Sequence, residues 1–576
     1  MHGNAPVSGV IWKLKPRDEA AEIELARAAG VHSLVAAVLR ARGITTPQDV
    51  RDFLDADLSR LRDPFKLPDM RPAAERIVLA VGRNEPVLVH GDYDADGITA
   101  TALMVRFLNK LGADVHYFIP HRINDRYGLS PQAIDRAVAK GIGLILAVDC
   151  GVSDIDAVAR ARQLGADVIV IDHHEPGAQL PDALVVDPKR HDFHDNRDDL
   201  VAVGLAYKVA EAVSMLLDLS INSLRRAFLD LVAIGTVADV AELTGDNRIL
   251  VKHGLQVLPH SRKVGLRALL NISQLGGELT TQHIGFRLAP RLNAVGRMAD
   301  ATDAVDLLLT DDPEQAMRLA LKLEGHNRER QHEQELIFCD VLAMISQEVD
   351  LDTEPVIVLG SDKWHVGVVG IVASKVVERF HRPAFLMSRE GDTFRGSARS
   401  VEGFHVAAAL RSCSDLLIRY GGHALAGGFT LPAGKLPDFR RCLNEIARRS
   451  LRPQQLQPSV NIDCEVDIED VEPELVECLS QMQPFGNANP APVLASPNVE
   501  VADVRRVGNE DAHLKLLAGE GHRVFDCIGF GLGGEARWIE RGCRVDIAYT
   551  PEFNVFNGHV AIQLRLAAVR PFARGG

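Results

Sequence analysis

Short, uninterrupted apolar runs alternate with amphipathic stretches through residues 71–255. Five of these runs have the length of β-strands, and they cover residues 87–89, 115–119, 144–148, 168–171 and 184–186. Strands without polar positions are typical of a sheet that is buried on both faces. Because helical stretches separate the strands, the pattern predicts right-handed βαβ units and an α/β fold with a doubly wound parallel sheet.

A second pattern predicts one long helix over residues 313–346. Asp312 can cap this helix, and Pro313 suits its first turn. The middle, residues 324–335, contains no apolar side chain. A helix that is polar on all sides usually bridges domains through solvent, and this one would span roughly 50 Å. The sequence therefore predicts a long connecting helix between two globular halves.

The second half of the chain changes character at about residue 451. Residues 351–450 mix apolar strands with helical stretches, whereas the following region shows alternating strands. Asn557-Gly558, between two such strands, is a strong hairpin signal. The pattern predicts a second α/β domain and then a small antiparallel β-barrel of the OB-fold type. We expect an N-terminal helical segment, a parallel-sheet domain, a helical connector, this second α/β domain and the barrel, at residues 1–70, 71–255, 256–350, 351–450 and 456–576.

Composition limits the functional classes. Hydrophobic residues make up 46% and charged residues 25% of the 576 residues, which is ordinary for a soluble globular protein. No apolar run approaches the ~18 residues of a membrane span, and no secretory signal is visible at the N-terminus. The eight cysteines are scattered without a Cys-x-x-Cys pair, which favours reduced thiols in a cytoplasmic protein. The net charge of −14 argues against sequence-independent binding to duplex DNA but does not exclude a nucleic-acid enzyme.

Acidic and histidine residues follow several of the predicted strands. Ligands bind beyond the carboxyl ends of the strands in such a sheet, so we expect these side chains to converge. They are His90, Asp92, Asp94 and Asp96 after the first strand, Asp149 after the third, Asp172, His173 and His174 after the fourth, and Asp239 further along.

Burying like charges together is costly, and divalent cations are the simplest compensation. Carboxylate and imidazole ligands favour Mn²⁺ or Mg²⁺, and two such ions would hold a phosphodiester between them. Each cluster alone has a plainer interpretation: a solvated Asp-rich turn, an incidental His-His pair, or a helix-end charge at Asp239. Their joint occurrence favours a metal centre.

These residues also carry a family resemblance. Residues 90–97 and 172–174 resemble the motifs of the DHH phosphoesterase superfamily, and residues 396–400 and 421–428 resemble its companion DHHA1 domain. Within the superfamily the chain is similar to the RecJ family of single-strand-specific 5′-to-3′ DNA exonucleases, from about residue 35 onward. Further matches to that family are residues 288–297, 364–370 and 484–490. One departure is Gly427, where the family often has alanine.

The resemblance implies roles for individual residues. It implies metal ligands at Asp94, Asp96, Asp149, His173 and Asp239, and His90 matches a ligand position in the wider superfamily. His174 would orient or protonate the reacting phosphate, beside Asp149 and Asp94 as catalytic residues. The alternative for His174 is an imidazole that fixes His173 or a carboxylate.

Substrate contacts are expected from two further groups of residues. A terminal phosphate needs fixed donors, and arginine supplies a planar fork. We expect Arg122, Ser397 and Arg399 to hold the 5′ phosphate, although Arg122 could instead pair with Asp125. By motif position, the expected contacts to the strand are Arg291, Asn293, Arg297 and His423. Phenylalanines of the barrel, such as Phe525, Phe530, Phe553 and Phe556, either stack on bases or pack in its core.

The expected protein is a monomeric cytoplasmic exonuclease that uses two Mn²⁺ or Mg²⁺ ions. It would thread single-stranded DNA through a cleft between its two α/β domains and degrade it 5′ to 3′ to 5′ mononucleotides. The resemblance implies roles in recombination and in DNA repair, including mismatch repair. It also implies a single-stranded-DNA-binding protein and a RecQ-type helicase as partners. The alternatives are a DHH phosphodiesterase acting on short oligonucleotides or cyclic dinucleotides, and a catalytically silent DHH scaffold.

Overall fold

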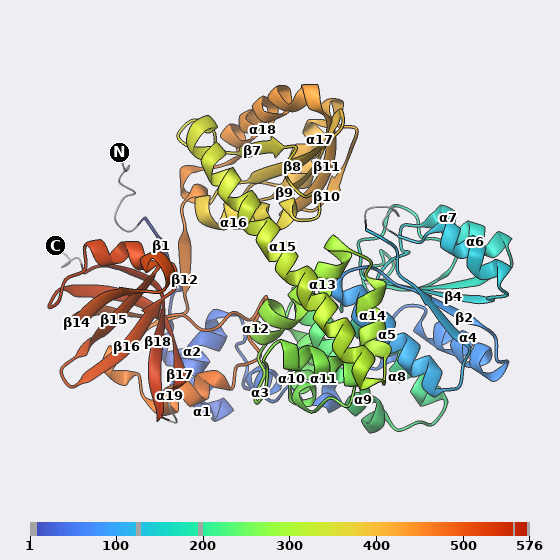
Figure 1. Cartoon of the computed structure of the whole chain (residues 1–576). Coiled ribbons are helices and arrows are strands. Elements are labelled where there is room, and N and C mark those ends of the chain that lie inside the picture. Colours follow the sequence, from blue (N-terminus) through green and yellow to red (C-terminus); the bar gives the residue numbers. More distant parts are fainter. Residues whose placement is uncertain (1–8, 123–127, 194–199, 557–558, 573–576) are drawn as a thin grey trace. The chain divides into compact units, whose positions relative to one another are not determined.

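The structure is a computed structural model that describes residues 9–122, 128–193, 200–556 and 559–572 (Figure 1). The chain divides into two compact units. The first, which we call the parallel-sheet unit, contains residues 56–335 and 484–490. The second, which we call the composite unit, contains residues 1–55, 336–483 and 491–576. Each unit is described by itself.

The parallel-sheet unit is built around five parallel strands in the order β3-β2-β4-β5-β6. Their bounds are β2 (Val87–His90), β3 (Val115–Phe118), β4 (Leu144–Val148), β5 (Asp167–Ile171) and β6 (Leu184–Val186). All five coincide with the apolar runs of the sequence. The parallel sheet predicted from those runs is therefore confirmed.

Side-chain alternation along the strands places an apolar core on each face of this sheet. Leu144, Leu146 and Val148 of β4 join one core, whereas Ile145 and Ala147 join the other. The first core is covered by α4 (Met70–Gly82), α5 (Ala95–Lys110) and α8 (Ala202–Leu216), and the second by α6 (Pro131–Ala139) and α7 (Ile155–Gln163). The sheet is thus doubly wound, with helices on both of its faces (Figure 1).

Further helices extend this unit beyond the sheet. They are α9 (Ile221–Ala238), α10 (Gly245–Val257), α11 (Val264–Ile272), α12 (Thr281–His283), α13 (Ala289–Met298) and α14 (Thr302–Leu309). The predicted connecting helix is present as α15 (Pro313–Glu348). Its start is capped as expected, because the amide of Glu314 donates to Asp312 Oδ1 at 3.0 Å.

The composite unit contains the second α/β domain. Its sheet has the order β10-β11-β9-β8-β7, in which only the β7–β8 pair is parallel. The strands are β7 (Ile357–Ser361), β8 (Ala384–Glu390), β9 (Thr393–Arg399), β10 (Arg419–Gly422) and β11 (Ala426–Pro432), and the helices are α16 (Val369–Phe380), α17 (Val406–Ser412) and α18 (Leu436–Ser450). Most of the glycine-rich segment 421–428 pairs as a hairpin, with Gly421 opposite Gly428.

The C-terminal region is a closed barrel, as predicted. Pairing of β14 with β17 closes the order β14-β15-β16-β18-β17. The pairing is antiparallel except between β16 and β18, which the alternating pattern did not reveal. The elements are β13 (Cys464–Glu465), α19 (Pro473–Ser480), β14 (Leu494–Val507), β15 (His513–Glu520), β16 (Arg523–Gly529), β17 (Arg544–Phe556) and β18 (His559–Pro571). Asn557 and Gly558, the predicted hairpin turn, lie outside the described residues. Phe525 is buried, whereas Phe530 and Phe553 are exposed.

The N-terminal segment contains the expected helices and one strand that the sequence did not reveal. The helices are α1 (Glu19–Ala29), α2 (Ser33–Ala41) and α3 (Pro47–Asp55). Before them, β1 (Ile11–Leu14) pairs in parallel with β12 (Ser459–Ile462). This pairing joins segments almost 450 residues apart, so no local pattern could predict it.

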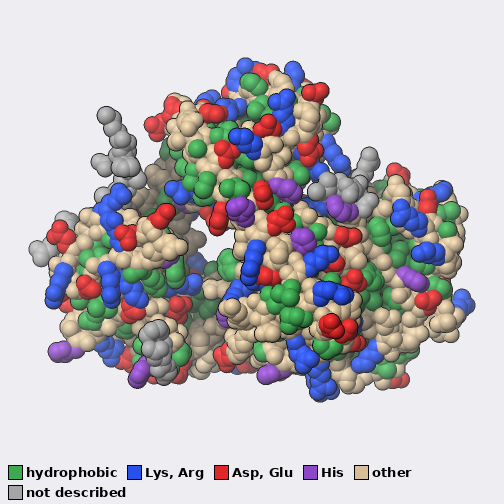
Figure 2. Space-filling model, viewed as in Figure 1, with side chains coloured by type: hydrophobic (Ala, Val, Ile, Leu, Met, Phe, Trp, Pro, Cys, Tyr) green, Lys and Arg blue, Asp and Glu red, His purple; other side chains and the backbone are tan. Residues whose placement is uncertain are grey.

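Charge is distributed evenly over the visible surface. Basic and acidic side chains are interspersed on the face shown in Figure 2, so the charge of −14 forms no single acidic field there. Among the described helices, none combines the length and the apolar character that crossing a membrane requires.

Candidate active site

Three strands of the parallel sheet end in the candidate site. The Asp-rich turn follows β2, Asp149 follows β4, and the Asp172-His173-His174 segment follows β5. Their ligand atoms form three groups whose members lie within 4.8 Å of one another. The groups are Asp92 with Asp94 and Asp149, Asp96 with His173 and Asp239, and Asp149 with His173 and His174. The structure thus brings five of the six predicted metal ligands together, all except His90.

Local backbone geometry directs the Asp-rich turn. Asp94 caps α5, with its Oδ1 accepting the amides of Asp96 and Gly97 at 3.0 and 3.1 Å. Only glycine fits at position 97, because a Cβ there would lie 2.8 Å from the carbonyl oxygen of Asp92. Asp96 faces the protein interior, where it accepts the amides of Ala202 and Val203 at the start of α8, at 2.7 and 2.9 Å. These contacts fix both carboxylates before any ligand binds.

Asp149 occupies a strained position. Its φ of 65° lies in the left-handed region, which non-glycine residues seldom adopt, and its side chain is buried. The amide of Asp149 donates to the carbonyl of Ile171 on β5 at 3.0 Å, which continues the strand pairing to this point. Such strain persists where the surrounding structure enforces it, and it is common at functional sites.

His173 lies at the centre of the carboxylates. Its Nε2 lies 3.2 Å from Asp149 Oδ1, 3.8 Å from Asp96 Oδ2 and 3.9 Å from Asp239 Oδ2. Burial, assisted by the neighbouring His174, lowers the pKa of His173 to about 4. The ring is therefore neutral at pH 7, which is the form that binds a metal ion.

The buried carboxylates match a cation in charge. Burial, together with the neighbouring carboxylates, raises the pKa of Asp92, Asp96 and Asp149 well above the ordinary value. In addition, Asp92 Oδ1 is buried and accepts no hydrogen bond from any described residue. Oxygen ligands with one neutral imidazole suit Mn²⁺ or Mg²⁺, so the residues present fit these ions.

His174 has a different electrostatic role from its neighbour. Its Nδ1 lies 2.7 Å from Oδ1 of buried Asp172. Burial opposes a charge on this ring, but the hydrogen bond to Asp172 and the charges of Asp172, Asp94 and Asp239 together outweigh it and raise the pKa of His174 to about 9. Asp172 is itself fixed by the amides of Val152 and His173 at 3.0 and 2.8 Å. The site therefore pairs a neutral imidazole with a cationic one.

His90 lies outside the three groups of ligand atoms. Its Nε2 accepts the amide of Ser130 at 3.2 Å, and its Nδ1 lies 3.7 Å from Cys150 Sγ. The ring also packs 5.2 Å from that of Phe118. Metal binding by His90 stays a prediction, and the contacts at both nitrogens are those of a structural histidine.

Helix α13 supports the Asp-rich turn from the side. Asn293 Oδ1 accepts the amide of Ala95 at 2.8 Å. A Cβ on Gly296 would lie only 2.4 Å from the carbonyl oxygen of Tyr93. The motif at residues 288–297 thus holds the Asp-rich turn in place. The sequence predicted contacts of Asn293 to the DNA strand and did not reveal this supporting role. Arg291 pairs with Glu324 at 2.7 Å, and Arg297 is half-buried on the same helix.

Arg122 lies close to the turn. Its guanidinium carbon is 5.0 Å from the centroid of the Tyr93 ring, a cation–π contact. The alternative partner Asp125 lies outside the described residues. Arg122 thereby comes next to the turn that carries Asp92 and Asp94.

Ser397 and Arg399 belong to the composite unit. They alternate onto one face of β9, as predicted, and a Cβ on Gly370 would lie 3.1 Å from Ser397 Oγ and 3.5 Å from an Arg399 nitrogen. Gly370 is in the first turn of α16, so a helix N-terminus, a guanidinium and a hydroxyl lie together. His423 is exposed in the turn between β10 and β11.

Family models match three parts of the chain. The model of the N-terminal domain of the DHH family matches residues 86–236, that of the DHHA1 domain residues 353–449, and that of the RecJ OB domain residues 462–568. The first match contains Asp94, Asp96, Asp149 and His173 and ends just before Asp239.

Whole-chain relatives extend these matches. The chain is 37% identical over 559 residues to the single-stranded-DNA-specific exonuclease RecJ of Bacillus subtilis, covering 96% of this chain and 70% of the relative. It is 34% identical over 553 residues to the RecJ of Escherichia coli, covering 92% and 94%. The crystal structure of RecJ in complex with Mn²⁺ from Thermus thermophilus superposes with a TM-score of 0.84 at 32% identity, covering 97% of this chain and 79% of that one.

Proposed function

This chain belongs to the RecJ family of single-stranded-DNA-specific exonucleases, and from this premise we propose how its own residues hydrolyse single-stranded DNA. The observation that supports the assignment of the site is the convergence of three strand ends into one group of carboxylates around a neutral imidazole. We propose that Asp94, Asp96, Asp149, His173 and Asp239 hold two divalent cations, Mn²⁺ or Mg²⁺. Solved structures of a relative in complex with Mn²⁺ and with Mg²⁺ support the choice of metal.

Divalent cations held there supply charge neutralisation of the phosphodiester and a lowered pKa for the attacking water. The protein supplies the positions. The amides that bind Asp94 and Asp96 keep these carboxylates oriented, and His173, neutral at pH 7, offers Nε2 without adding a like charge. The catalytic carboxylates Asp94 and Asp149 thus act by holding the reacting groups in place.

His174 acts on the phosphate in this proposal. Its Nδ1 is occupied by Asp172, so the proton that it presents is on Nε2. With a pKa of about 9 the ring is cationic at pH 7 and donates a charge-assisted hydrogen bond to the phosphate oxygen. Asp172 is then the residue that fixes the tautomer and the charge of His174.

We further propose that digestion starts at the 5′ end and releases 5′ mononucleotides. The proposed receptor for the terminal phosphate consists of Arg122, Ser397 and Arg399. This proposal is supported by the position of Ser397 and Arg399 next to the first turn of α16. A hydroxyl, a guanidinium and a helix N-terminus together suit an anion. Arg291 and Arg297 on α13 and His423 in the β10–β11 turn are proposed to contact the strand behind its end.

The proposed setting is the cytoplasm, where the enzyme works as a monomer in recombination and DNA repair. Its proposed partners are a single-stranded-DNA-binding protein and a RecQ-type helicase. These proposals follow from family membership and can be tested by pull-down with purified partners and by light scattering of the purified chain.

An end-labelled assay tests the function directly. With Mn²⁺ or Mg²⁺, single-stranded DNA should be digested and a duplex of the same sequence should not, and a chelator should abolish the reaction. Asp149→Asn should lower the rate at least about 100-fold, whereas Asp156→Asn, an exposed aspartate in the same region, should not change it. Hydrolysis of dinucleotides without any activity on long strands would instead support the short-oligonucleotide phosphodiesterase.

A further inference from the structure

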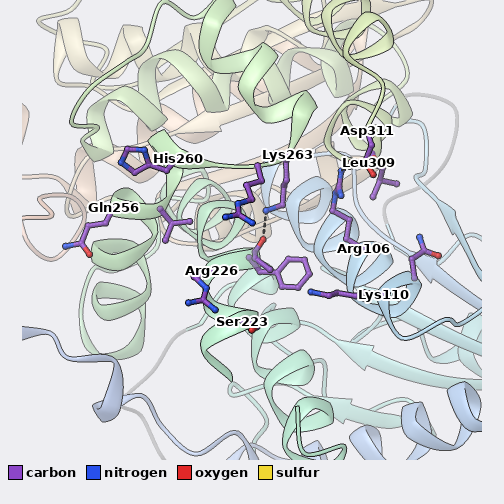
Figure 3. A pocket seen from close by; sticks show the side chains of 14 residues that line it. Arg106, Lys110, Ser223, Arg226, Gln256, His260, Lys263, Leu309 and Asp311 are labelled. Carbon is purple, nitrogen blue, oxygen red and sulfur yellow. Dashed lines mark hydrogen bonds and ion pairs between the residues drawn. The ribbon is translucent and has the colours of Figure 1, made fainter. Parts of the chain in front are cut away.

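A large cavity lies in the parallel-sheet unit, away from the metal-ligand cluster. Its volume is about 1040 Å³, and its walls come from α5, α9, α10, α14 and the segment between α10 and α11 (Figure 3). Helix α5 starts beside Asp94 and reaches the cavity only at its last turns, with Arg106 and Lys110. Sixteen residues of α helix span about 24 Å, so the cavity is distant from the metal-ligand cluster. We call it the far-end cavity.

Two of the basic residues in the far-end cavity have structural partners. Arg106 donates to the carbonyls of Leu308 and Leu309, and its guanidinium also lies 3.0 Å from Asp311 Oδ1. Lys263 binds the buried carboxylate of Asp230 at 2.7 Å. These contacts of Arg106 and Lys263 hold the walls of the cavity together. Asp311, which pairs with Arg106, is the only acidic residue among the described residues that line the cavity.

Three further cations line the same cavity without such compensation. Lys110, Arg226 and Arg262 are exposed, and no carboxylate of residues 9–122, 128–193, 200–556 and 559–572 forms an ion pair with them. In a chain whose net charge is −14, three uncompensated cations around one hollow are a local reversal of charge. Like charges brought together repel, and a bound anion removes this repulsion.

The remaining lining residues indicate the type of anion. Ser223, Gln256 and Asn109 add neutral donors, whereas Val257 and Leu309 add apolar surface. Arginine forks match phosphate oxygens, and the volume is at the upper end of the roughly 300–1,000 Å³ of small-ligand sites. We propose that the far-end cavity binds a small polyphosphate of the nucleoside 5′-triphosphate class. This proposal does not depend on the exonuclease mechanism.

Calorimetry on the full chain tests the proposal, in EDTA so that no cation bridges the ligand to the carboxylates. ATP and inorganic tripolyphosphate are the probes. We expect both to bind the wild type, and the Arg226→Ala/Arg262→Ala variant to bind each at least ten-fold more weakly. Arg83→Ala, which removes an exposed arginine outside the cavity, should bind like the wild type. Metal-dependent digestion by the double variant should be unchanged, because neither arginine lies in the proposed active site.

The results that overturn the proposal are equally definite. Failure of both probes to bind at millimolar concentration would overturn it, as would equal binding by the wild type and a folded double variant, with folding checked by thermal melting. If the double variant lost affinity for a long 5′-hydroxyl oligothymidylate while the wild type ignored both probes, the cavity would be a strand-binding surface and not a polyphosphate site.

Val240, the residue that follows Asp239, has a strained backbone conformation. Val240 has a φ of 57°, a left-handed conformation that is strongly disfavoured for a β-branched side chain. Its side chain is 66% exposed, so packing of that side chain does not explain the conformation. Strain of this kind requires other contacts to hold it.

Asn487 supplies those contacts. Its Nδ2 donates to the carbonyl of Val240 at 2.9 Å, and its own carbonyl accepts the amide of Leu243 at 2.9 Å. The segment 484–490 belongs to the parallel-sheet unit although the chain on either side of it belongs to the composite unit. It is anchored there by Arg248, which donates to the Pro484 carbonyl at 3.3 Å, and by the packing of Gly486 on Leu243.

We infer that Asn487 is a positioning residue for the carboxylate of Asp239. It acts through the backbone of Val240, and it holds the end of α9 in the one conformation that turns Asp239 toward His173. The inference rests on the proposed role of Asp239 as a metal ligand. It also gives the motif at residues 484–490 a purpose that is independent of DNA binding by the barrel.

Mn²⁺ binding, followed by the electron paramagnetic resonance signal of the free ion, tests this inference. Asn487→Ala should weaken Mn²⁺ binding about ten-fold, and raising the Mn²⁺ concentration should restore kcat. Asn222→Ala, an exposed asparagine on α9 of the same unit, serves as the control and should bind like the wild type.

Asp239→Asn separates the two possible failures. If Asp239→Asn weakens Mn²⁺ binding and Asn487→Ala does not, the positioning role is wrong. If neither variant has an effect, the proposed ligand set itself fails.

Discussion

The imidazole of His174 and the carboxylate of Asp172 are joined by a 2.7 Å hydrogen bond between Nδ1 and Oδ1. This contact makes two consecutive histidines electrostatically opposite, with a pKa of about 4 for His173 and about 9 for His174. At pH 7 one imidazole is therefore neutral and the other cationic, which suits their proposed roles as metal ligand and as hydrogen-bond donor.

Replacing Asp172 with asparagine should remove the charge of His174 at neutral pH. Without the Asp172 carboxylate, burial is opposed only by the charges of Asp94 and Asp239, and the pKa of the ring falls. If the protonated ring is the active form, the alkaline limb of the kcat profile should move from near pH 9 in the wild type to below pH 7 in the variant. At pH 8 we expect a loss of about 100-fold. Unchanged profiles from pH 5 to 10 would show that His174 does not act by its charge.

The close approach of α13 to the Asp-rich turn gives a steric prediction. Gly296→Ala would place a Cβ 2.4 Å from the carbonyl of Tyr93, between Asp92 and Asp94, so the turn must shift. We expect weaker Mn²⁺ binding and lower activity. Gly325→Ala, on α15, is the matched control, because a Cβ at this position meets no atom within 4 Å. This substitution should stabilise the helix by about 0.5–1 kcal/mol. Equal activities of the two variants would contradict the supporting role of α13.

Asp187, at the end of β6, gives a prediction about stability. Burial raises the pKa of its carboxyl to about 7. The folded protein therefore holds a proton that the unfolded chain releases near pH 4, and stability falls as the pH rises between these two values.

Asp187→Asn cannot ionise and should melt at a higher temperature than the wild type. The advantage should be smaller at pH 5 than at pH 8, where it should reach roughly 2–4 kcal/mol. Thermal melting at both pH values measures this difference. A variant that is less stable than the wild type at pH 8 would contradict the assignment.

The proposed receptor for the 5′ phosphate can be tested with two DNA substrates that differ only in their 5′ end. Arg399→Ala should slow the digestion of a 5′-phosphorylated strand by about ten-fold or more and change that of a 5′-hydroxyl strand little. Arg395→Ala removes an exposed arginine from the same strand, β9, and should leave the preference for 5′ phosphate unchanged. If wild type and Arg399→Ala discriminate equally between the two ends, Arg399 is not part of the receptor.

Local signals were sufficient for the architecture of the parallel sheet. Four of the five strands are largely buried apolar runs, whereas the edge strand β3 is half-exposed and contains His116. The rule that ligands meet at the carboxyl edge predicted that Asp94, Asp149 and His173 lie together, as they do. The cap at Asp312 likewise located the start of α15. These features depend on residues close together in sequence, or on a general rule of sheet topology.

Features that depend on distant residues could not be predicted. The pairing of β1 with β12, the support that α13 gives to the Asp-rich turn and the contact of Asn487 with Val240 each join segments far apart in sequence. For His90, the position in the motif suggested a metal ligand, but the motif could not reveal that its two ring nitrogens contact Ser130 and Cys150. Spacing along the chain gives no information on such contacts.

The most direct test of the whole account is anomalous diffraction from a crystal grown with Mn²⁺. Two manganese ions are expected among the carboxylates and the imidazole, bound by Asp94, Asp96, Asp149, His173 and Asp239. Both anomalous peaks should disappear in Asp149→Asn or become much weaker. Finding these side chains dispersed, or a wild-type site without anomalous signal at saturating Mn²⁺, would contradict it.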